Sequence, residues 1–292
     1  MAEIILDKIN YTYSDGTAYE IQALKDVNLQ IHQGEFIGII GHTGSGKSTL
    51  TQLLNGLLRA SSGSIYVDGQ DIYDEGYDMK ALRSKVGLVF QYPDHQLFET
   101  TCFEDVCFGP KNQGLSPEEC EKRAREALQL VGLKEKYYDH SPFDLSGGQK
   151  RRAAIAGVLA MRPKVLVLDE PTAGMDAFAR RQMWNLLKKL NQQKLTILLT
   201  THYMEEAETL CDRVGFMCGG RLEETDAPGH MIEMLGRYAV DETSPDGLKS
   251  HYFHGKEEAI QYLSASEQET ALRSTTLEDV FLETIGQQLE CR

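Results

Sequence analysis

The stretch that decides the fold is Phe36-Ile-Gly-Ile-Ile-Gly-His-Thr-Gly-Ser-Gly-Lys-Ser-Thr49, where an apolar run leads into a glycine-rich loop and then into an apolar helical pattern. It matches the pattern GxxxxGK[ST] in the strand, loop and helix setting that a phosphate-binding loop requires. Glycines let several backbone N–H groups turn toward one place, and the start of the next helix adds partial positive charge there. The stretch therefore predicts an anion site for phosphate groups.

The positions of this loop have different predicted tasks. The Lys47 ammonium group would bring a full charge to the β- and γ-phosphates, and the Ser48 hydroxyl would bind Mg²⁺. The rest of the loop would surround the phosphates; these candidate nucleotide-binding residues are Gly41, His42, Thr43, Gly44, Ser45, Gly46 and Thr49.

Two carboxylates follow a second apolar run, Val165–Leu168, as Asp169 and Glu170. In open α/β sheets, ligands bind beyond the carboxyl ends of the strands, so both acids should face the phosphates. Asp169 suits a Mg²⁺ shell, because hard cations take oxygen ligands. Glu170 is placed to orient or deprotonate a water molecule in line with the γ-phosphate, which makes it the candidate catalytic base.

Short apolar runs bounded by Gly or Asp alternate with helical patterns along the chain: Phe36–Ile40, Val86–Phe90, Val165–Leu168 and Thr196–Thr200. Such alternation is typical of an α/β fold with a mostly parallel sheet buried on both faces. Ser116, Pro117 and Glu119 supply an N-cap, a first-turn proline and a capping-box residue, so a helix is expected over residues 117–131. The long helical insertion predicts an α-helical subdomain at about 92–160.

The pattern breaks near residues 226–228, and the stretch 241–246 (DETSPD) is typical of a linker. We therefore expect a main domain over residues 1–225 and a small C-terminal extension over 226–292. That extension holds 13 acidic and 5 basic residues and accounts for −8 of the net charge of −14.

Composition excludes several classes of protein. An acidic chain argues against a nucleic-acid partner bound through phosphate neutralisation. The longest apolar run, residues 153–161, is too short for a transmembrane helix, and the N-terminus does not have the pattern of a secretory signal. We therefore expect the chain to stay on the cytoplasmic side.

The segment Leu145-Ser-Gly-Gly-Gln149, which ends 20 residues before Asp169, resembles the signature motif of the ATPases of ABC transporters. In this resemblance Ser146, Gly147, Gly148 and Gln149 bind nucleotide, and they face the phosphate-binding loop of a second ATPase subunit. Ser146 and Gln149 also form a capping box at the start of a helix, so the motif has a structural explanation as well.

Further positions match the same family. Tyr13 resembles the aromatic residue that stacks on adenine, and Gln91 resembles the Q-loop glutamine that reaches Mg²⁺ and the membrane partner. Asp176 closes a segment that resembles the D-loop, and His202 resembles the H-loop histidine that contacts the γ-phosphate. The resemblance covers about residues 3–225. It implies catalytic roles for Lys47, Gln91, Glu170 and His202, metal ligation by Ser48, Gln91 and Asp169, and ATP and Mg²⁺ as cofactors.

The same resemblance implies an antiparallel β edge beside the parallel sheet. It also implies two partners: a second ABC ATPase subunit, either this chain or a paralogue, and integral membrane subunits at the cytoplasmic face of the cell membrane.

The subfamily signals differ along the chain. Four segments resemble the ATPases of energy-coupling factor transporters, which drive uptake of vitamins or transition-metal ions: 91–98, 104–106, 108–110 and 116–117. Residues 199–207 and 275–282 instead resemble the ATPases of drug and polysaccharide exporters. We favour uptake, because the Q-loop and the helical subdomain are where ABC ATPases bind their membrane partners. Export is the alternative, and a soluble ABC ATPase acting on DNA or ribosomes is a third reading.

Overall fold

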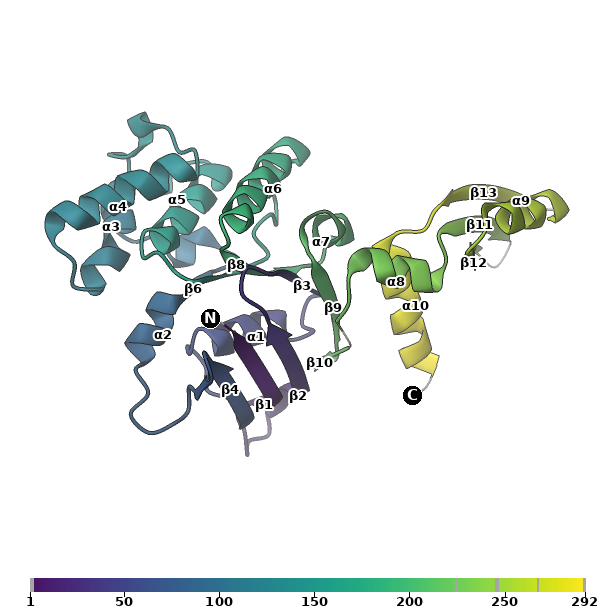
Figure 1. Cartoon of the computed structure of the whole chain (residues 1–292), viewed down its shortest axis with the longest axis horizontal. Helices are drawn as coiled ribbons and strands as arrows, with labels where there is room; N and C mark the ends of the chain where they lie inside the picture. The colour runs from purple at the N-terminus through teal and green to yellow at the C-terminus, as the bar shows by residue number, and fades with distance from the viewer. Residues whose placement is uncertain (1–2, 224, 245–246, 267, 291–292) are drawn as a thin grey trace.

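The computed structural model describes residues 3–223, 225–244, 247–266 and 268–290. A mostly parallel six-stranded sheet, in the order β10-β9-β3-β8-β7-β6, carries the predicted phosphate-binding loop (Figure 1). Its strands are β3 (Phe36–Ile40), β6 (Val86–Val89), β7 (Val165–Asp169), β8 (Thr196–Thr201), β9 (Arg213–Cys218) and the short antiparallel β10 (Arg221–Leu222). The four strands predicted from sequence are confirmed, with ends that differ by at most one residue.

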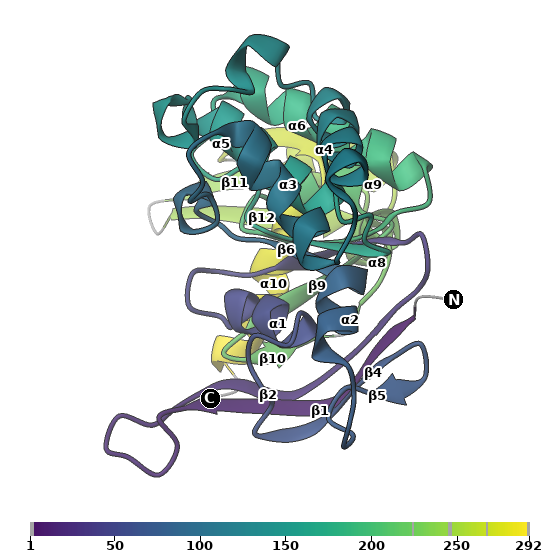
Figure 2. The same cartoon turned by 90° about the vertical axis from the view of Figure 1, so that its left-hand side faces the viewer.

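A separate antiparallel sheet, in the order β2-β1-β4-β5, forms the expected β edge. Its strands are β1 (Ile4–Tyr13), β2 (Ile21–Ile31), β4 (Ser62–Val67) and β5 (Gln70–Asp71). Helix α1 (Lys47–Leu54) lies between the two sheets (Figure 2), and its buried Leu50 and Leu53 join a core with Ile4 of β1 and Ile39 of β3. The helix that follows the loop is thereby fixed from both sides.

Helices cover the other face of the six-stranded sheet. They are α3 (Cys102–Asn112), α4 (Pro117–Leu130), α5 (Gly147–Leu159), α6 (Ala177–Gln192) and α7 (Met204–Leu210). Helix α2 (Met79–Lys85) instead lies on the side of α1, where its Leu82 joins the same core as Leu53. Helices α3, α4 and α5 pack on one another within the range expected for a helical subdomain. The predicted helix at 117–131 is confirmed and ends one residue earlier, and the Ser116 hydroxyl accepts a hydrogen bond from Glu119 N–H at 3.3 Å.

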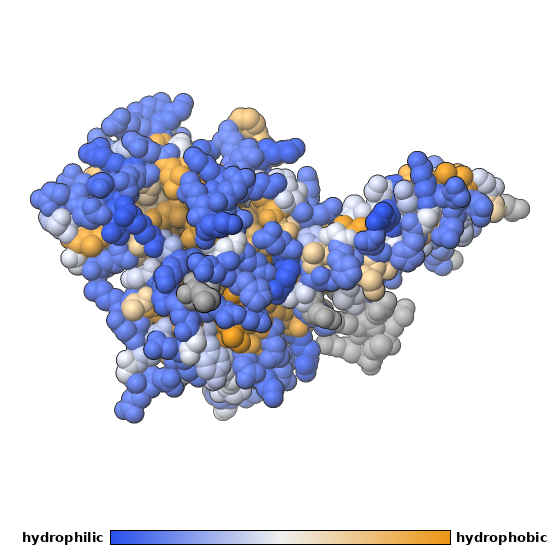
Figure 3. Space-filling view, viewed as in Figure 1, coloured by the Kyte–Doolittle hydropathy of each residue, from blue (hydrophilic) through white to orange (hydrophobic). Residues whose placement is uncertain are grey.

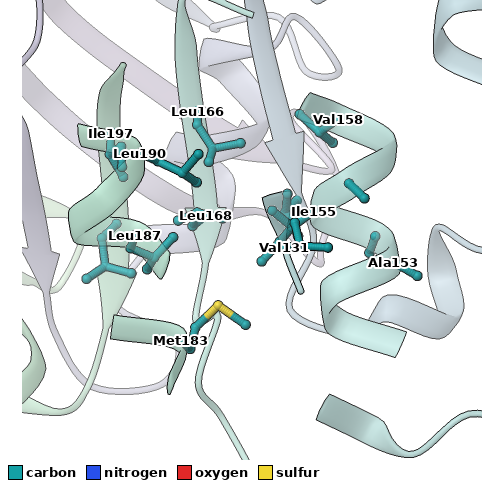
Figure 4. Close-up of a cluster of buried hydrophobic side chains, with 14 of the residues drawn as sticks. Val131, Ala153, Ile155, Val158, Leu166, Leu168, Met183, Leu187, Leu190 and Ile197 are labelled. Carbon is teal, nitrogen blue, oxygen red and sulfur yellow. The ribbon is translucent and has the colours of Figure 1, made fainter. Parts of the chain in front are cut away.

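The core shows why the sheet is buried on both faces. Along β7, Leu166 and Leu168 point toward α5 and α6, whereas Val165 and Val167 join the core around α1. Figure 4 shows the two leucines between Ile155 of α5 and the side chains of α6. Alternate side chains of β7 are thus buried in two different cores. This arrangement fixes the register of β7 and hence the position of the carboxylates at its end.

The C-terminal part, called here the C-terminal unit, projects from one side of the molecule (Figure 1). It contains α8 (Pro228–Leu235), β11 (Tyr238–Ser244), β12 (Gly247–Phe253), α9 (Lys256–Ala265), β13 (Glu269–Ser274) and α10 (Leu277–Glu290). The strands form an antiparallel sheet in the order β12-β11-β13, and α9 packs on all of them. The linker expected at 241–246 is wrong for residues 241–244, which lie in β11; residues 245–246 lie outside the described residues.

Helix α10 returns to the main domain and packs on α7. Leu277 is fully buried there, and its N–H donates to Glu208 Oε2 at 3.2 Å. The ring of Phe281 lies 5.2 Å from that of Phe216 in β9. The C-terminal unit is therefore docked on the helix that follows His202.

Among the described residues, no helix has the length and apolar content that a bilayer span would need.

Candidate functional site

The loop between β3 and α1 has the backbone that phosphate binding requires. Gly44 and Gly46 adopt positive φ angles of 81° and 111°, which favour glycine. A Cβ atom on Gly41 would lie 2.4 Å from the Met217 carbonyl oxygen, so only glycine fits beside β9. Gly46 is the N-cap of α1 and no side chain caps this helix, which leaves its first N–H groups free of intrahelical partners.

Lys47 stands at the centre of this loop and is almost fully buried. Its Nζ donates to the carbonyl oxygens of Gly41 at 2.7 Å and of His42 at 3.0 Å. The exposed Ser48 follows in the first turn of α1, and the buried Ser45 Oγ has no hydrogen-bond partner among the described residues. A fixed ammonium group, open N–H groups and free hydroxyls fit a bound polyphosphate and a magnesium ion.

Three predicted residues from distant parts of the sequence meet at Glu170. Lys47 Nζ lies 3.3 Å from Glu170 Oε1, while Gln91 Nε2 donates to Oε2 at 3.0 Å. His202 Nδ1 lies 3.2 Å from the same Oε2. The carboxylate thus contacts the loop lysine, the second residue after β6 and the first residue after β8. This cluster stands at the carboxyl ends of three adjacent parallel strands.

The backbone holds Glu170 in an unusual conformation. Its φ angle is +44°, in the left-handed region that non-glycine residues rarely adopt. Its N–H donates to the carbonyl oxygen and to the Oγ1 of Thr200, both at 3.1 Å. Thr200 Oγ1 in turn donates to Asp169 Oδ1 at 2.6 Å. Thr200 therefore holds the Glu170 backbone and the Asp169 carboxylate at once, and no motif in the sequence pointed to it.

Tyr13 lies beside the start of the helix that follows the loop. Its hydroxyl and Thr49 Oγ1 are 3.1 Å apart, which places the end of β1 beside the first turn of α1. The Tyr13 side chain is 38% exposed and meets the Tyr11 ring edge-on at 4.8 Å. Its ring is accessible next to the phosphate-binding loop, where a base could stack.

The signature residues lie apart from this cluster. Ser146 is the N-cap of α5 and donates its N–H to Gln149 Oε1 at 2.9 Å, while Ser146 and Gly147 are exposed. Within the described part of the chain, no hydrogen bond or ion pair joins 146–149 to the phosphate-binding loop. Asp176 is also separate: it caps α6 by accepting a hydrogen bond from Ala179 N–H at 2.8 Å.

Two buried charged residues near the site were missed by sequence reasoning. Arg151 is 4% exposed and its Nη1 donates to the Phe90 carbonyl oxygen at 2.9 Å; burial lowers its pKa to about 10. Glu206 accepts hydrogen bonds from Thr172 Oγ1 at 2.8 Å and Trp184 Nε1 at 2.9 Å, and burial raises the pKa of its carboxyl group. The one available signal was that Arg151 stands two residues after the signature segment.

The fold and the cluster define an ATP-binding cassette, a class of protein in which a phosphate-binding loop meets a catalytic glutamate. A model of the ABC transporter family matches residues 24–173, and the chain belongs to this family of ATPases. It is 50% identical over 235 residues to the energy-coupling factor transporter ATP-binding protein EcfA2 of Caldanaerobacter subterraneus, covering 80% of this chain and 82% of that one. The predicted likeness to energy-coupling factor ATPases is thereby confirmed.

Other relatives agree. The EcfA2 protein of Clostridium acetobutylicum is 52% identical over 220 residues, which cover 75% of this chain and 77% of that one. The solved structure of cbiO1 from Clostridium perfringens, part of the ABC transporter complex cbiONQ, is 42% identical with a TM-score of 0.69, covering 78% of this chain and 89% of that one. The dimeric ATP-binding cassette MJ0796 with ADP and Pi, in a post-hydrolysis state, is 34% identical with a TM-score of 0.70, covering 77% and 98%.

Proposed function

We propose that this chain hydrolyses ATP at the cluster around Glu170 and thereby drives uptake of a vitamin or a transition-metal ion by an energy-coupling factor transporter. The observation that carries the chemistry is the convergence of Lys47, Gln91 and His202 on one carboxylate beside the phosphate-binding loop. The names of the relatives support the type of transporter.

Binding is assigned to the loop and its neighbours. The N–H groups at the start of α1 and the Lys47 ammonium group hold the β- and γ-phosphates, and the accessible Tyr13 ring stacks on the adenine. Ser48, Gln91 and Asp169 supply the oxygen atoms for Mg²⁺. When bound, the ion neutralises charge on the phosphate oxygens. Thr200 keeps Asp169 oriented through their 2.6 Å hydrogen bond.

Hydrolysis is assigned to Glu170 and its partners. The Glu170 carboxylate orients a water molecule and accepts its proton, while Gln91 and His202 fix the orientation of that carboxylate. His202 also contacts the γ-phosphate in this assignment. Because nucleotide binding is assigned to the loop and its neighbours, Glu170 contributes to the rate of hydrolysis and not to the affinity for ATP.

The remaining predicted residues are assigned to a second cassette, either this chain or a paralogue. Ser146 and Gly147 are exposed at the N-terminus of the 13-residue helix α5, away from the cluster of their own chain. This helix start is a second anion site, which would approach the γ-phosphate on the facing subunit. Asp176, exposed at the start of α6, would lie in the same interface.

A groove between the sheet and the helical subdomain is the proposed binding place for the membrane subunits at the cytoplasmic face. Its volume is about 520 Å³, and Phe98 and Phe108 line it with ring centroids 4.8 Å apart. Both rings are substantially exposed at 57% and 39%. Figure 3 shows apolar surface over the helical part of an otherwise largely hydrophilic exterior. Gln96 also lines the groove, five residues after Gln91.

Replacing both rings, as Phe98→Ser with Phe108→Ser, is expected to lower the amount of chain that sediments with membranes at least tenfold. ATP hydrolysis by the isolated chain should stay within about twofold, because neither ring touches the Glu170 cluster. Leu248→Ser, which changes a 68% exposed residue of the C-terminal unit, is the matched control and should not affect membrane binding. Unchanged sedimentation of the double variant would refute this groove as the docking surface.

The membrane protein that co-purifies with the chain tests the direction of transport. A small substrate-binding subunit with a separate coupling subunit supports uptake, whereas a six-helix permease supports export. One structural observation bears on the alternative: the two exporter-like segments lie on neighbouring elements, since α10 packs on α7. The Leu277 N–H donates to Glu208, one residue after the first segment. These segments therefore lie where the C-terminal unit docks on α7, and they do not line the groove.

Deleting residues 241–292 is expected to leave ATP affinity within about threefold of the full chain while altering assembly or regulation. The residues that would hold nucleotide are distant from the C-terminal sheet, but the deletion uncovers the surface on α7 that Leu277 buries. Titration with a fluorescent ATP analogue measures affinity, and circular dichroism checks folding. An order-of-magnitude loss of affinity in a folded truncated chain would contradict a modular C-terminal unit.

A further inference from the structure

The segment that bears Gln91 is held from both sides by two consecutive residues of α5. Arg151 Nη1 donates to the carbonyl oxygen of Phe90, directly before Gln91, at 2.9 Å. Lys150 Nζ pairs with Asp94 Oδ1, three residues after Gln91, at 2.6 Å. Among the described residues, neither cation has a hydrogen bond or ion pair with Gln91 itself. Together these two contacts hold the backbone segment that bears Gln91, and we call this pair of contacts the α5 clamp.

The clamp joins two parts of the proposed catalytic machinery. On one side, Gln91 Nε2 donates to Glu170 Oε2, so any shift of the gripped segment moves a hydrogen bond to the catalytic carboxylate. On the other side, Lys150 directly follows Gln149, the last residue of the signature segment, on the same helix. A displacement of α5 is therefore transmitted to the Glu170 cluster through contacts that the structure shows.

The two halves of the clamp differ in burial. Arg151 is 4% exposed, so its loss would leave a buried carbonyl oxygen without its partner and could disturb the core. The Asp94 side chain is 53% exposed and that of Lys150 is 17% exposed. Ion pairs so close to solvent contribute little to stability. The Lys150–Asp94 pair can thus be broken without unfolding the chain.

We propose that Lys150 and Arg151 are positioning residues that set Gln91 against Glu170, so that the hydrolytic step in one chain depends on where its own signature helix lies. This inference rests on the proposed function, because it requires Glu170 to act in hydrolysis and α5 to meet nucleotide on a facing subunit. It assigns a role to an ion pair and a buried arginine outside the recognised motifs, and it makes the signature helix part of the control of Gln91.

The test is a charge exchange in the purified full-length chain. Asp94→Lys alone and Lys150→Asp alone should each lower kcat for ATP at least fivefold with KM changed less than twofold, since neither residue touches the nucleotide. The double exchange restores an ion pair of opposite polarity and should return kcat to within about threefold of the unmutated chain. Full recovery is not expected, because the Lys150 ammonium group also lies 5.7 Å from the centre of the Phe143 ring.

Glu126→Gln is the matched control. It removes an ion pair of the same subdomain, Arg162 Nη2 to Glu126 Oε2 at 3.0 Å, that lies away from Gln91, and should leave kcat unchanged. Single variants with unmutated kcat, or a double exchange no more active than the singles, would overturn the clamp. An unmutated chain that hydrolyses no ATP, either alone or together with its paralogous cassette, would instead refute the proposed function, so the two failures are distinguishable.

Discussion

Glu170→Gln is expected to lower the turnover of ATP at least about a hundredfold, since a positioned general base contributes roughly 10²–10⁴-fold. The amide has nearly the same size as the carboxylate and keeps an oxygen that can accept from Gln91. It cannot accept a proton from water at neutral pH. The interaction with the attacking water exists mainly in the transition state, so ATP binding should stay within about threefold of the unmutated chain.

Single-turnover hydrolysis in the presence of Mg²⁺ and equilibrium binding of ATP measure the two effects separately. Glu205→Gln is the control, because Glu205 is an exposed glutamate at the start of α7, close in sequence to His202. It should retain unmutated turnover. If Glu170→Gln also retains it, the carboxylate has been assigned the wrong role.

The strands of the main sheet were predictable because full burial leaves a clear pattern in the sequence. Phe36–Ile40 and Thr196–Thr201 are buried at every position, and such strands appear as short uninterrupted apolar or threonine-containing runs. The convergence of Lys47, Gln91 and His202 on Glu170 was predictable in outline for the same reason. Once the strands are parallel neighbours, the residues after their carboxyl ends must meet at one edge.

The contacts that orient those residues were not predictable. Thr200 bonds to Asp169 only because β7 and β8 pair in one particular register, and a single threonine in a buried strand carries no signal of that bond. Arg151 donates to Phe90, 61 positions away in the sequence. It stands near the start of α5, where the capping box of Ser146 and Gln149 already explains the local sequence. Sequence motifs identify the groups that touch a ligand, whereas side chains that act through others depend on packing.

The strand β11 shows a different reason for failure. Its residues Asp241 and Glu242 are typical of a linker when read alone. In the structure, Asp241 is paired with Arg273 and Glu242 accepts from Tyr262, so partners from β13 and α9 compensate the charge and the hydrogen-bonding groups. Those partners lie 20 and 32 residues away. A polar strand whose stabilising contacts are all non-local cannot be distinguished from a linker by composition.

Mixing Lys47→Ala chains with Ser146→Arg chains is expected to restore ATP hydrolysis that neither variant shows alone. The Lys47→Ala chain lacks the ammonium group in the middle of the phosphate-binding loop, and the Ser146→Arg chain carries a bulky side chain at the start of α5. Within one chain these two places have no direct hydrogen bond or ion pair among the described residues. Each variant can therefore keep intact the element that the other has lost.

In a symmetric dimer with shared sites, a mixed dimer holds one site made of an unmutated loop and an unmutated signature segment, and one doubly damaged site. Random pairing makes about half of the dimers mixed, so roughly a quarter of the unmutated activity should return if the sites act independently. Adding either variant to itself at the same total concentration is the control and should give no recovery. Mixed dimers, demonstrated by two affinity tags, that remain inactive would refute sites shared between identical chains. If no such dimers form, the facing subunit is a paralogue, and the same exchange should then succeed when one substitution is placed in that protein.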